Sequence, residues 1–258
     1  MMKLKEQHIV VTGASSGLGY AMAEALLKEG ATVALSSRPG EKLSEAVHNL
    51  TRQGLHAVEL PMDVRSEQSV NDAVDWVKKR WGKIDVLINN AGIGMRTVNP
   101  QFLTDPQPFF KVSPDGFRDL MDTNVTGYFL VSRGFVPFMA EQGKGKIINI
   151  SMNYETMKRK GFVPYGPSRA ATESLSYIMA EDLKSYGITV NMLLPGGATI
   201  TGMIPDEVKK QLEGKFQLLD PEVMAKPIVF LASGESEGIT GERIVAIEFD
   251  KWLQEKGK

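Results

Sequence analysis

Tyr165 and Arg169 are four residues apart, a spacing that places two side chains on one face of a helix. A phenol has a pKa of about 10 in water, so it needs a nearby positive charge to act as an acid or base at neutral pH. Arginine keeps its proton at neutral pH, so it can supply hydrogen bonds and an electric field but no proton. The pair therefore predicts a proton-transfer site.

A glycine-rich loop follows the apolar run at 8–12 and precedes a helical pattern. In such a loop one glycine makes the tight turn, a second lets backbone approach a pyrophosphate, and a third lets helix pack closely on strand. The helix N-terminus adds free N–H groups and a partial positive charge. A tight turn alone could use the same glycines, but the position between a strand and a helix favours a dinucleotide site. Its candidate residues are Gly13, Ser15, Ser16, Gly17, Leu18 and Gly19.

The end of the second apolar run indicates which dinucleotide is preferred. An acidic residue there would bind a ribose 2′-hydroxyl and repel a 2′-phosphate, whereas this chain has Ser37 and Arg38. Hydroxyls and a guanidinium suit a phosphate dianion, so NADP(H) is favoured over NAD(H), unless Arg38 is merely solvated in a turn. After the third run, Asp63 and Val64 are candidates to hold the adenine; Asp63 could equally cap the following helix.

Composition excludes several other classes of protein. The 258 residues carry 30 Lys+Arg and 31 Asp+Glu, a net charge of −1, which argues against a nucleic-acid partner. Absence of cysteine excludes disulfides and thiolate metal sites, and the three histidines lack ligand spacing, so no metal is expected. No signal-peptide core and no stretch of about 18 apolar residues is present, which predicts a cytoplasmic protein without a membrane partner.

Short apolar runs alternate with helical patterns along the chain. Strands are predicted at 8–12, 32–36, 56–61, 84–88, 146–150, 188–194 and 243–247. Helices are predicted at 17–29, 41–53, 66–81, 114–141, 165–186 and 221–232. This alternation predicts an α/β fold, a parallel sheet with helices on both faces. Residues 1–258 are interpreted as a single domain, with candidate substrate loops at 94–114 and 196–220, each following the carboxyl end of a strand.

Several motifs together resemble the short-chain dehydrogenase/reductase family over about residues 5–245: the loop at 12–19, Asn89-Asn90-Ala91-Gly92, the Tyr165 pair, Asn124 in MDTNVTG and Pro195-Gly196. The resemblance implies a Rossmann-like, doubly wound seven-stranded sheet. It also implies a small-molecule substrate and a homodimer or homotetramer formed through the helices at 114–141 and 165–186. Further cofactor-binding residues implied by the resemblance are Asn90, Ala91, Gly92, Tyr165, Arg169, Pro195, Gly196, Gly197 and Thr199.

In that family a Tyr exchanges the substrate's proton, a Lys binds the nicotinamide ribose and lowers the Tyr pKa, a Ser polarises the substrate oxygen, and an Asn holds a relay water. Tyr165 matches the Tyr and Asn124 the Asn, although Asn124 could instead bond neighbouring backbone. Arg169 replaces the Lys, and Met152 occupies the usual Ser position.

Ser151, the nearest hydroxyl and a further catalytic candidate, should point to the other face of its strand by alternation. Asn153 or Tyr154 could then supply the substrate donor, and Met152, Asn153 and Tyr154 are counted as candidate substrate-binding residues.

The loop at 94–114 looks about ten residues longer than is usual in the family. Phe102, Phe109 and Phe110 could wall an apolar pocket over the nicotinamide, or could pack the insertion onto the domain. The basic run Lys158-Arg159-Lys160 is either a solvated loop or an attractor of anionic substrates. Met203 and Ile204, in the second loop, belong to a predicted lid.

The leading hypothesis is an NADP(H)-dependent oxidoreductase that interconverts a carbonyl and a secondary alcohol. The Tyr165 and Arg169 pair also resembles the halohydrin dehalogenases, so dehalogenase- or elimination-type chemistry is a second hypothesis. The third is an NADP(H)-binding sensor or scaffold without turnover, suggested by Met152 in place of the usual Ser.

Overall fold

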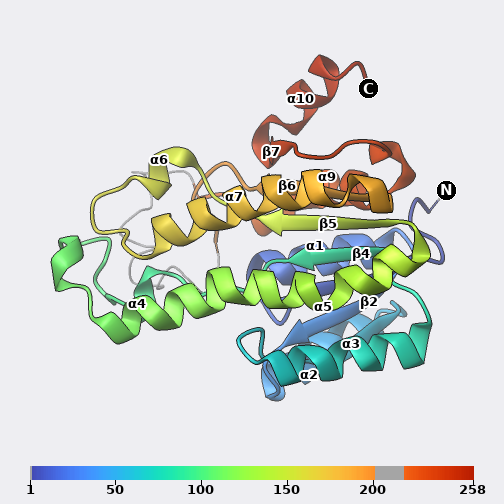
Figure 1. The fold of residues 1–258 in the computed structure, drawn as a ribbon, viewed down its shortest axis with the longest axis horizontal. Helices are drawn as coiled ribbons and strands as arrows, with labels where there is room; N and C mark the ends of the chain where they lie inside the picture. The colour runs from blue at the N-terminus through green and yellow to red at the C-terminus, as the bar shows by residue number, and fades with distance from the viewer. Residues whose placement is uncertain (1, 201–217) are drawn as a thin grey trace.

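The computed structural model describes residues 2–200 and 218–258, whose strands form one parallel sheet in the order β3-β2-β1-β4-β5-β6-β7 (Figure 1). The strands are β1 (His8–Thr12), β2 (Thr32–Ser37), β3 (Ala57–Pro61), β4 (Val86–Asn89), β5 (Gly145–Ile150), β6 (Ile188–Leu194) and β7 (Arg243–Val245). The strand order reverses between β1 and β4, and ligands bind at such a switch point in open parallel sheets. The predicted seven-stranded doubly wound fold is confirmed.

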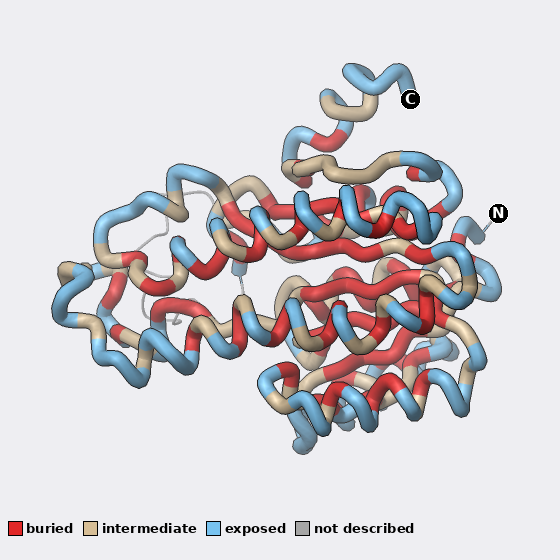
Figure 2. Tube along the Cα trace, viewed as in Figure 1, coloured by how far each residue is buried: buried red, intermediate tan, exposed pale blue. Residues whose placement is uncertain are grey.

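Helices cover both faces of the sheet because neighbouring residues of each strand point to opposite sides. Ile9 and Val11 of β1 belong to the core beneath one set of helices, and Val10 belongs to the core beneath the other. The first set is α1 (Gly17–Lys28), α2 (Glu41–Thr51), α9 (Ala225–Ala232) and α10 (Phe249–Glu255). The second set is α3 (Glu67–Trp81), α5 (Gly127–Gln142) and α7 (Tyr165–Asp182). Figure 2 shows the strands buried between these layers.

The segment 114–141, predicted as one helix, is divided in the structure. α4 (Pro114–Met121) passes into a π-helical turn at Asp122–Thr126 before α5 begins. The turn contains Asn124, whose amide bonds both backbone groups of Ile93, a partner 31 residues away. A widened turn next to such a contact is typical of functional sites, and local sequence alone does not predict it.

Other boundaries differ from prediction because 3₁₀ turns replace the predicted ends of several elements. The helix predicted at 165–186 ends at Asp182 and is followed by a 3₁₀ turn at Lys184–Tyr186. The helix predicted at 221–232 begins as a 3₁₀ turn at Pro221–Met224. The strand predicted at 243–247 ends at Val245 and leads through a turn at Ala246–Glu248 into α10, a helix that the sequence patterns do not predict.

Long loops extend beyond the carboxyl ends of the strands, on the left of Figure 1. The loop at 94–114 contains 3₁₀ turns at Met95–Thr97 and Phe109–Lys111, and α6 (Tyr154–Met157) follows β5. Most of the second predicted loop, including Met203 and Ile204, lies at 201–217, outside the described residues.

Candidate active site

The glycine loop between β1 and α1 packs directly against the chain that leaves β4. A Cβ on Gly13, whose φ is +63°, would lie 2.7 Å from the Cα of Ala91. A Cβ on Gly19 would lie 2.4 Å from the carbonyl oxygen of Gly13, so a side chain at either position would push these segments apart. Asn90 completes the contact, because its Nδ2 donates to the carbonyl oxygens of Thr12 (2.9 Å) and Gly13 (3.1 Å).

The Thr12 hydroxyl joins the ends of β1 and β4. Its oxygen accepts hydrogen bonds from the backbone N–H groups of Asn90 (2.9 Å) and Ala91 (3.0 Å), and its proton is donated to the carbonyl of Ile88 (3.3 Å). Thr12 is 1 % exposed. This one side chain holds the crevice at the switch point in place.

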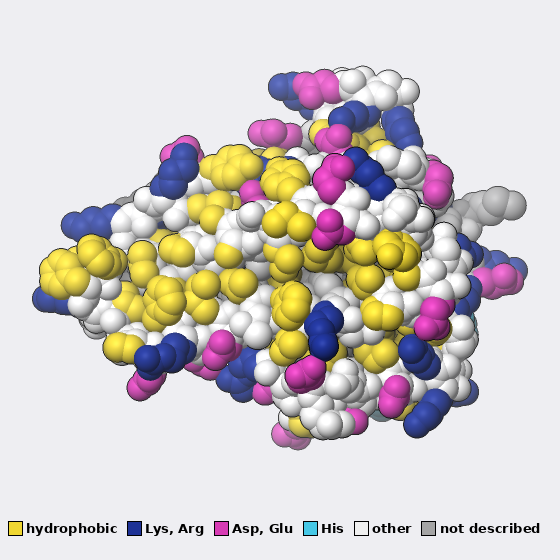
Figure 3. All heavy atoms as spheres, viewed as in Figure 1, with side chains coloured by type: hydrophobic (Ala, Val, Ile, Leu, Met, Phe, Trp, Pro, Cys, Tyr) yellow, Lys and Arg dark blue, Asp and Glu magenta, His cyan; other side chains and the backbone are white. Residues whose placement is uncertain are grey.

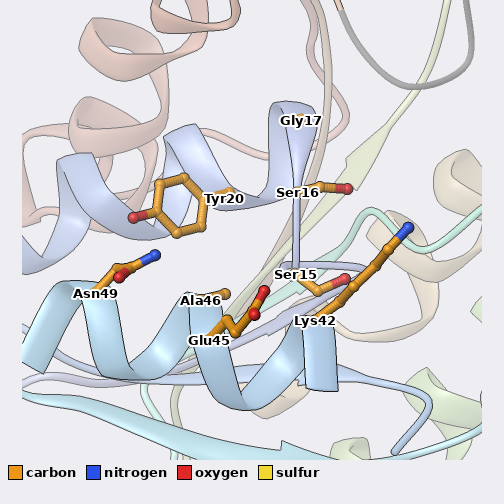
Figure 4. Close-up of a pocket in the computed structure, with 8 residues that line it drawn as sticks. All are labelled: Ser15, Ser16, Gly17, Tyr20, Lys42, Glu45, Ala46 and Asn49. Carbon is orange, nitrogen blue, oxygen red and sulfur yellow. The ribbon is translucent and has the colours of Figure 1, made fainter. Parts of the chain in front are cut away.

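The N-terminus of α1 has free hydrogen-bond donors that suit an anion. Its N-cap, Ser16, has an extended backbone and its side chain caps no N–H group of the helix. An exposed helix start with unpaired N–H groups attracts a phosphate. Beside it lies an open cavity of about 270 Å³ between α1 and α2 (Figure 4). The cavity is lined by Ser15, Ser16, Gly17, Tyr20, Lys42, Glu45, Ala46 and Asn49.

Lys42 is a candidate residue that the sequence patterns did not single out. It stands on the first turn of α2, and Figure 4 shows its amine extending past Ser15 toward the side of the cavity where Ser16 lies. A cation next to two hydroxyls and a helix N-terminus adds to the positive field that a phosphate would meet. Leu18, by contrast, packs on the core through its side chain.

Ser37 and Arg38 lie at the carboxyl end of β2, as the sequence predicts. The Ser37 hydroxyl donates to the carbonyl of Arg38 (3.1 Å), and Arg38 itself is exposed. Within residues 2–200 and 218–258 its guanidinium makes no hydrogen bond or ion pair. Ser36, one residue earlier, has a buried hydroxyl with no hydrogen-bond partner among the described residues. The exposed guanidinium of Arg38 is therefore the group at this strand end that can meet a ligand without breaking a hydrogen bond to a described residue.

Asp63 and Val64 follow β3 on the same edge of the sheet. The Asp63 carboxylate accepts from the Arg65 side chain at 2.9 and 3.1 Å, and this hydrogen bonding lowers the pKa of Asp63. The alternative interpretation of Asp63 as the helix cap is wrong, because the side chain of Ser66 accepts from Ser69 N–H and caps α3. Val64 packs against Gly127, where a Cβ would approach it to 2.8 Å.

Tyr165 and Arg169 face each other on α7. The guanidinium carbon of Arg169 lies 5.4 Å from the centre of the Tyr165 ring. Tyr165 is partly exposed, whereas Arg169 is 3 % exposed. Burial by itself would lower the pKa of Arg169, but attraction to the oxygens of Tyr128 and Tyr165 outweighs it and raises that pKa. The cation is therefore permanent, as the sequence argument requires.

The start of α7 is held close to the short helix α6. A Cβ on Gly166 would lie only 2.0 Å from the carbonyl oxygen of Met157, so only glycine fits after Tyr165. This close approach fixes the position of Tyr165 relative to the loop at 151–162.

Asn124 lies beside the same pair, at the π-helical turn. Its Oδ1 accepts from Ile93 N–H (2.8 Å), and its Nδ2 donates to the Ile93 carbonyl (2.9 Å) and to the Ser168 hydroxyl (3.3 Å). A Cβ on Gly92 would lie 2.6 Å from Arg169 Nη2 and 3.1 Å from Asn124 Oδ1. In this structure the Asn124 amide therefore bonds nearby backbone, that of Ile93, as one of the two sequence hypotheses expects.

The residues just after β5 contact α7 and β7. The Ser151 hydroxyl donates to Oε1 of Glu173, two turns beyond Tyr165 on α7. The same carboxylate accepts from Arg243 Nε (2.9 Å), and Arg243 Nη2 donates to the Met152 carbonyl (2.7 Å). Met152 is 9 % exposed. Ser151 thus belongs to a buried ionic cluster that the sequence did not reveal.

Tyr154, a substrate-donor candidate from the sequence, contacts that cluster through its ring. The guanidinium carbon of Arg243 lies 3.8 Å from the centre of the Tyr154 ring. Hydrogen bonding with Tyr154 contributes to the raised pKa of Tyr177, after the larger effect of burial, so the Tyr154 hydroxyl lies toward the outer part of α7. Asn153 differs: its Nδ2 donates to the carbonyl of Gly196 (2.8 Å), just after β6.

The phenylalanines of the 94–114 loop divide into two groups. Phe102 is buried against Phe162 with ring centres 5.6 Å apart, in a small cluster with Met95 on which Tyr165 packs. Phe109 and Phe110 are 71 % and 72 % exposed and contact each other. Only Phe102 is therefore near Tyr165, and the expectation that all three wall one pocket is not met.

The chain after β6 leaves the sheet at the same edge as the chains after β1 and β4, because the strands are parallel. Pro195 is buried, and Gly196 has a φ of +99°. A Cβ on Gly196 would meet Ile247 at 2.5 Å. The Thr199 hydroxyl bonds the Gly197 carbonyl (3.3 Å), and Thr199 forms a bridge with Leu219. Gly196, Gly197 and Thr199 thus follow the strand end as expected for a loop that contacts a ligand.

Metal-binding and membrane-spanning features are absent from the described parts of the chain. Among residues 2–200 and 218–258, no three His, Asp or Glu side chains are grouped so that they could hold a metal ion. Over the same ranges, every helix is too short or too polar to span a membrane.

Comparison with known proteins gives consistent matches. Residues 7–212 match the family model described as short chain dehydrogenase. Gluconate 5-dehydrogenase of Gluconobacter oxydans is 35% identical over 196 residues, 76% of this chain and 73% of the relative. The 5-keto-D-gluconate 5-reductase of Escherichia coli K12 is 30% identical over 250 residues, 93% of this chain and 94% of the relative.

Among solved structures, a gluconate 5-dehydrogenase from Burkholderia cenocepacia in complex with NADP and tartrate superposes with a TM-score of 0.83 at 26% identity. The match covers 97% of both chains.

Proposed function

Because this chain belongs to the short-chain dehydrogenase family, we propose that it interconverts a carbonyl and a secondary alcohol on a small organic substrate with NADP(H). The protein is an NAD(P)-dependent oxidoreductase. The observation that carries the proposal of carbonyl–alcohol interconversion is Tyr165 beside the buried cation of Arg169, at the edge of the sheet where the glycine loop lies.

The preference for NADP(H) over NAD(H) is supported by the end of β2. Arg38 is exposed and makes no hydrogen bond or ion pair with described residues, and no carboxylate stands at the Ser37 position to repel a phosphate. Lys42 and the N-terminus of α1 add positive charge nearby. A neighbouring Glu45 lines the cavity but does not pair with Arg38 or Lys42. The NADP named in the Burkholderia cenocepacia structure is consistent with this preference.

Bound NADP(H) supplies or accepts the hydride. Tyr165 holds the proton: its hydroxyl gives that proton to the substrate oxygen in reduction and takes it back in oxidation. Arg169 stabilises the resulting phenolate, because its charge is permanent and buried beside the ring. Gly92 leaves room for this cation, since any side chain there would collide with Nη2.

Met152 in place of a serine leaves the substrate oxygen without the usual hydroxyl donor. We infer that Asn153 takes this part. Its Nδ2 bonds Gly196, but an amide has a second N–H and a carbonyl oxygen that remain for a ligand. The Ser151 hydroxyl donates to Glu173 of the Arg243 cluster, and the Tyr154 hydroxyl is hydrogen-bonded with Tyr177.

A keto or hydroxy sugar acid is the substrate class that we propose. Two relatives act on gluconate or 5-keto-D-gluconate by name, and tartrate accompanies NADP in the Burkholderia cenocepacia structure. In this chain Lys158, Arg159 and Lys160 are exposed between α6 and α7, next to the site. Three cations at that rim attract a carboxylate from solution.

The chain is proposed to form a homodimer or homotetramer through α5 and α7. Their outer faces expose Phe129, Tyr177 and Ile178, which are between 42 % and 55 % exposed. Figure 3 shows hydrophobic side chains gathered over this region. Such a patch on one face is typical of a subunit contact. Phe129→Glu is expected to give a smaller particle in analytical ultracentrifugation than the wild-type chain does.

The test combines binding with turnover. NADPH and NADH are titrated by fluorescence, and reduction of 5-keto-D-gluconate is followed for wild type and Tyr165→Phe. We expect NADPH to bind more tightly, and Tyr165→Phe to bind it equally well while losing more than nine-tenths of the rate. Binding without turnover over a panel of keto and hydroxy acids would favour the sensor. No binding of either nucleotide would favour dehalogenase-type chemistry.

A further inference from the structure

Arg169 is a buried cation that has no carboxylate partner among the described residues. Its guanidinium is 3 % exposed, and the groups that face it are two phenols and a backbone carbonyl. Nη1 donates to the hydroxyl of Tyr128 (2.8 Å) and to the carbonyl of Ile150 (3.0 Å). An isolated buried charge is costly, so these neutral acceptors are what keeps the guanidinium in its place.

Tyr128 is as deeply buried as the arginine. It stands on the first turn of α5, is 2 % exposed, and its hydroxyl donates to the Ile150 carbonyl (3.2 Å). The guanidinium carbon lies 5.5 Å from the Tyr128 ring centre and 5.4 Å from that of Tyr165, so the cation lies between two phenols.

The two phenols are not equivalent. Burial raises the pKa of Tyr128, and Arg169 offsets this only in part. The hydrogen bond from its hydroxyl to Ile150 also requires the proton to stay on Tyr128. Tyr165 is partly exposed at the crevice and can exchange its proton with a ligand. Of the two phenols beside Arg169, Tyr165 is therefore the one placed to exchange a proton with a ligand.

The chemistry of the cation explains why a tyrosine is needed here. A guanidinium has five N–H donors in a fixed plane, whereas a lysine ammonium has three on a flexible chain and ends nearer the backbone. Both hydrogens of Nη1 are used by Tyr128 and Ile150, which sets the plane of the group. Nε is buried and has no hydrogen-bond partner among the described residues.

We propose that Tyr128 is a positioning residue for Arg169: its hydroxyl fixes the guanidinium so that the positive charge acts on Tyr165, and the two residues work as a matched pair. This rests on the proposed function in that Tyr165 is taken as the proton donor. It goes further in assigning a role to a residue that touches neither substrate nor cofactor.

A double-mutant cycle tests the pairing. The variants are Tyr128→Phe, Arg169→Lys and both together, with Tyr186→Phe, an exposed tyrosine, as the matched control. Urea unfolding is measured for each variant without any ligand. Steady-state reduction of 5-keto-D-gluconate then gives the pH–rate profile, kcat and KM of each variant, and a fluorescence titration gives its Kd for NADPH.

Loss of one hydrogen bond to a charged group changes a rate or equilibrium constant by about tenfold or more. We expect Tyr128→Phe to lower kcat by about that factor, to move the pH–rate profile to higher pH and to leave KM nearly unchanged. In the Arg169→Lys background the same change should have little effect on rate or on unfolding, because the ammonium does not depend on the phenol.

Three outcomes would overturn the proposal. These are an unchanged pH–rate profile in Tyr128→Phe, an equal loss of rate in both backgrounds, or an unfolding free energy that is additive over the cycle. The unfolding cycle also separates this proposal from the proposed function. If the chain binds no NADPH, the proposed function is refuted. The unfolding cycle, measured without ligand, still shows whether Tyr128 and Arg169 are coupled.

Discussion

Removing Arg243 should destabilise the protein strongly, because its charge is paired inside the fold. In Arg243→Met, Glu173 loses its cationic partner at 2.9 Å and keeps the Ser151 hydroxyl as its side-chain partner among the described residues. The carbonyl of Met152 loses a donor at 2.7 Å and the Tyr154 ring loses the guanidinium stacked on it. The side chains of Arg243 and Glu173 are 14% and 6% exposed, so water replaces little of what is removed.

The expected loss follows from this burial. Breaking one side of a buried ion pair costs about 3–5 kcal/mol, because the remaining charge has no compensation. Replacing both members by apolar residues removes the orphaned charge, so Arg243→Met with Glu173→Leu should recover about half or more of the loss. An exposed pair behaves differently: Lys184 and Glu181 are 52% and 72% exposed, and Lys184→Met should cost less than about 1 kcal/mol.

The assay is urea unfolding followed by tryptophan fluorescence and circular dichroism, at one pH and one protein concentration. The free energy of unfolding is compared for wild type, the two single variants, the double variant and the Lys184→Met control. A loss below about 1 kcal/mol in Arg243→Met would refute the reasoning, since that is the range of surface pairs. So would a double variant whose loss equals the sum of the single losses.

Three further predictions concern the crevice. Ser37→Asp with Arg38→Leu should weaken NADPH relative to NADH by about tenfold to a hundredfold, measured as the ratio of dissociation constants; an unchanged ratio would place the phosphate elsewhere. If a missing hydroxyl limits carbonyl reduction, Met152→Ser should lower the activation barrier by up to about 3 kcal/mol and so raise the rate. An unchanged or lower rate would assign the donor to Asn153. Asp63 should contribute stability above its unfolded pKa of about 3.9, which is lost as pH falls further through its lowered folded pKa; Asp63→Asn should abolish this pH dependence in acid unfolding.

The strands and the glycine loop could be predicted because short apolar runs and spaced glycines are local signals. Strand alternation predicts that Ser151 and Met152 point to opposite faces, but the partner of Ser151, Glu173 on α7, could not be predicted from this pattern. The π-helical turn at Asp122–Thr126 could not be predicted in this way, since its cause, the pairing of Asn124 with Ile93, joins distant segments.

The Arg243 cluster could not be predicted from the sequence for the same reason. Arg243 meets Met152 across 91 residues and Glu173 across 70, and neither spacing forms a motif. Tyr128 lies next to a recognised motif, but its role depends on Arg169, 41 residues later. A tyrosine close to that motif, in a chain where arginine replaces the usual lysine, is the signal that could have suggested the pair.

The hydroxyl of Thr12 has a consequence for the deuterium-exchange behaviour of the crevice. Amides just past the end of a strand normally exchange quickly, because loop motion exposes them to solvent. The amides of Asn90 and Ala91 are past the end of β4, yet both donate to this buried oxygen. Their exchange should therefore be as slow as that of the strand interior. A valine at position 12 has nearly the same shape but no acceptor, so in Thr12→Val these two amides would exchange at the rate of the surrounding loop.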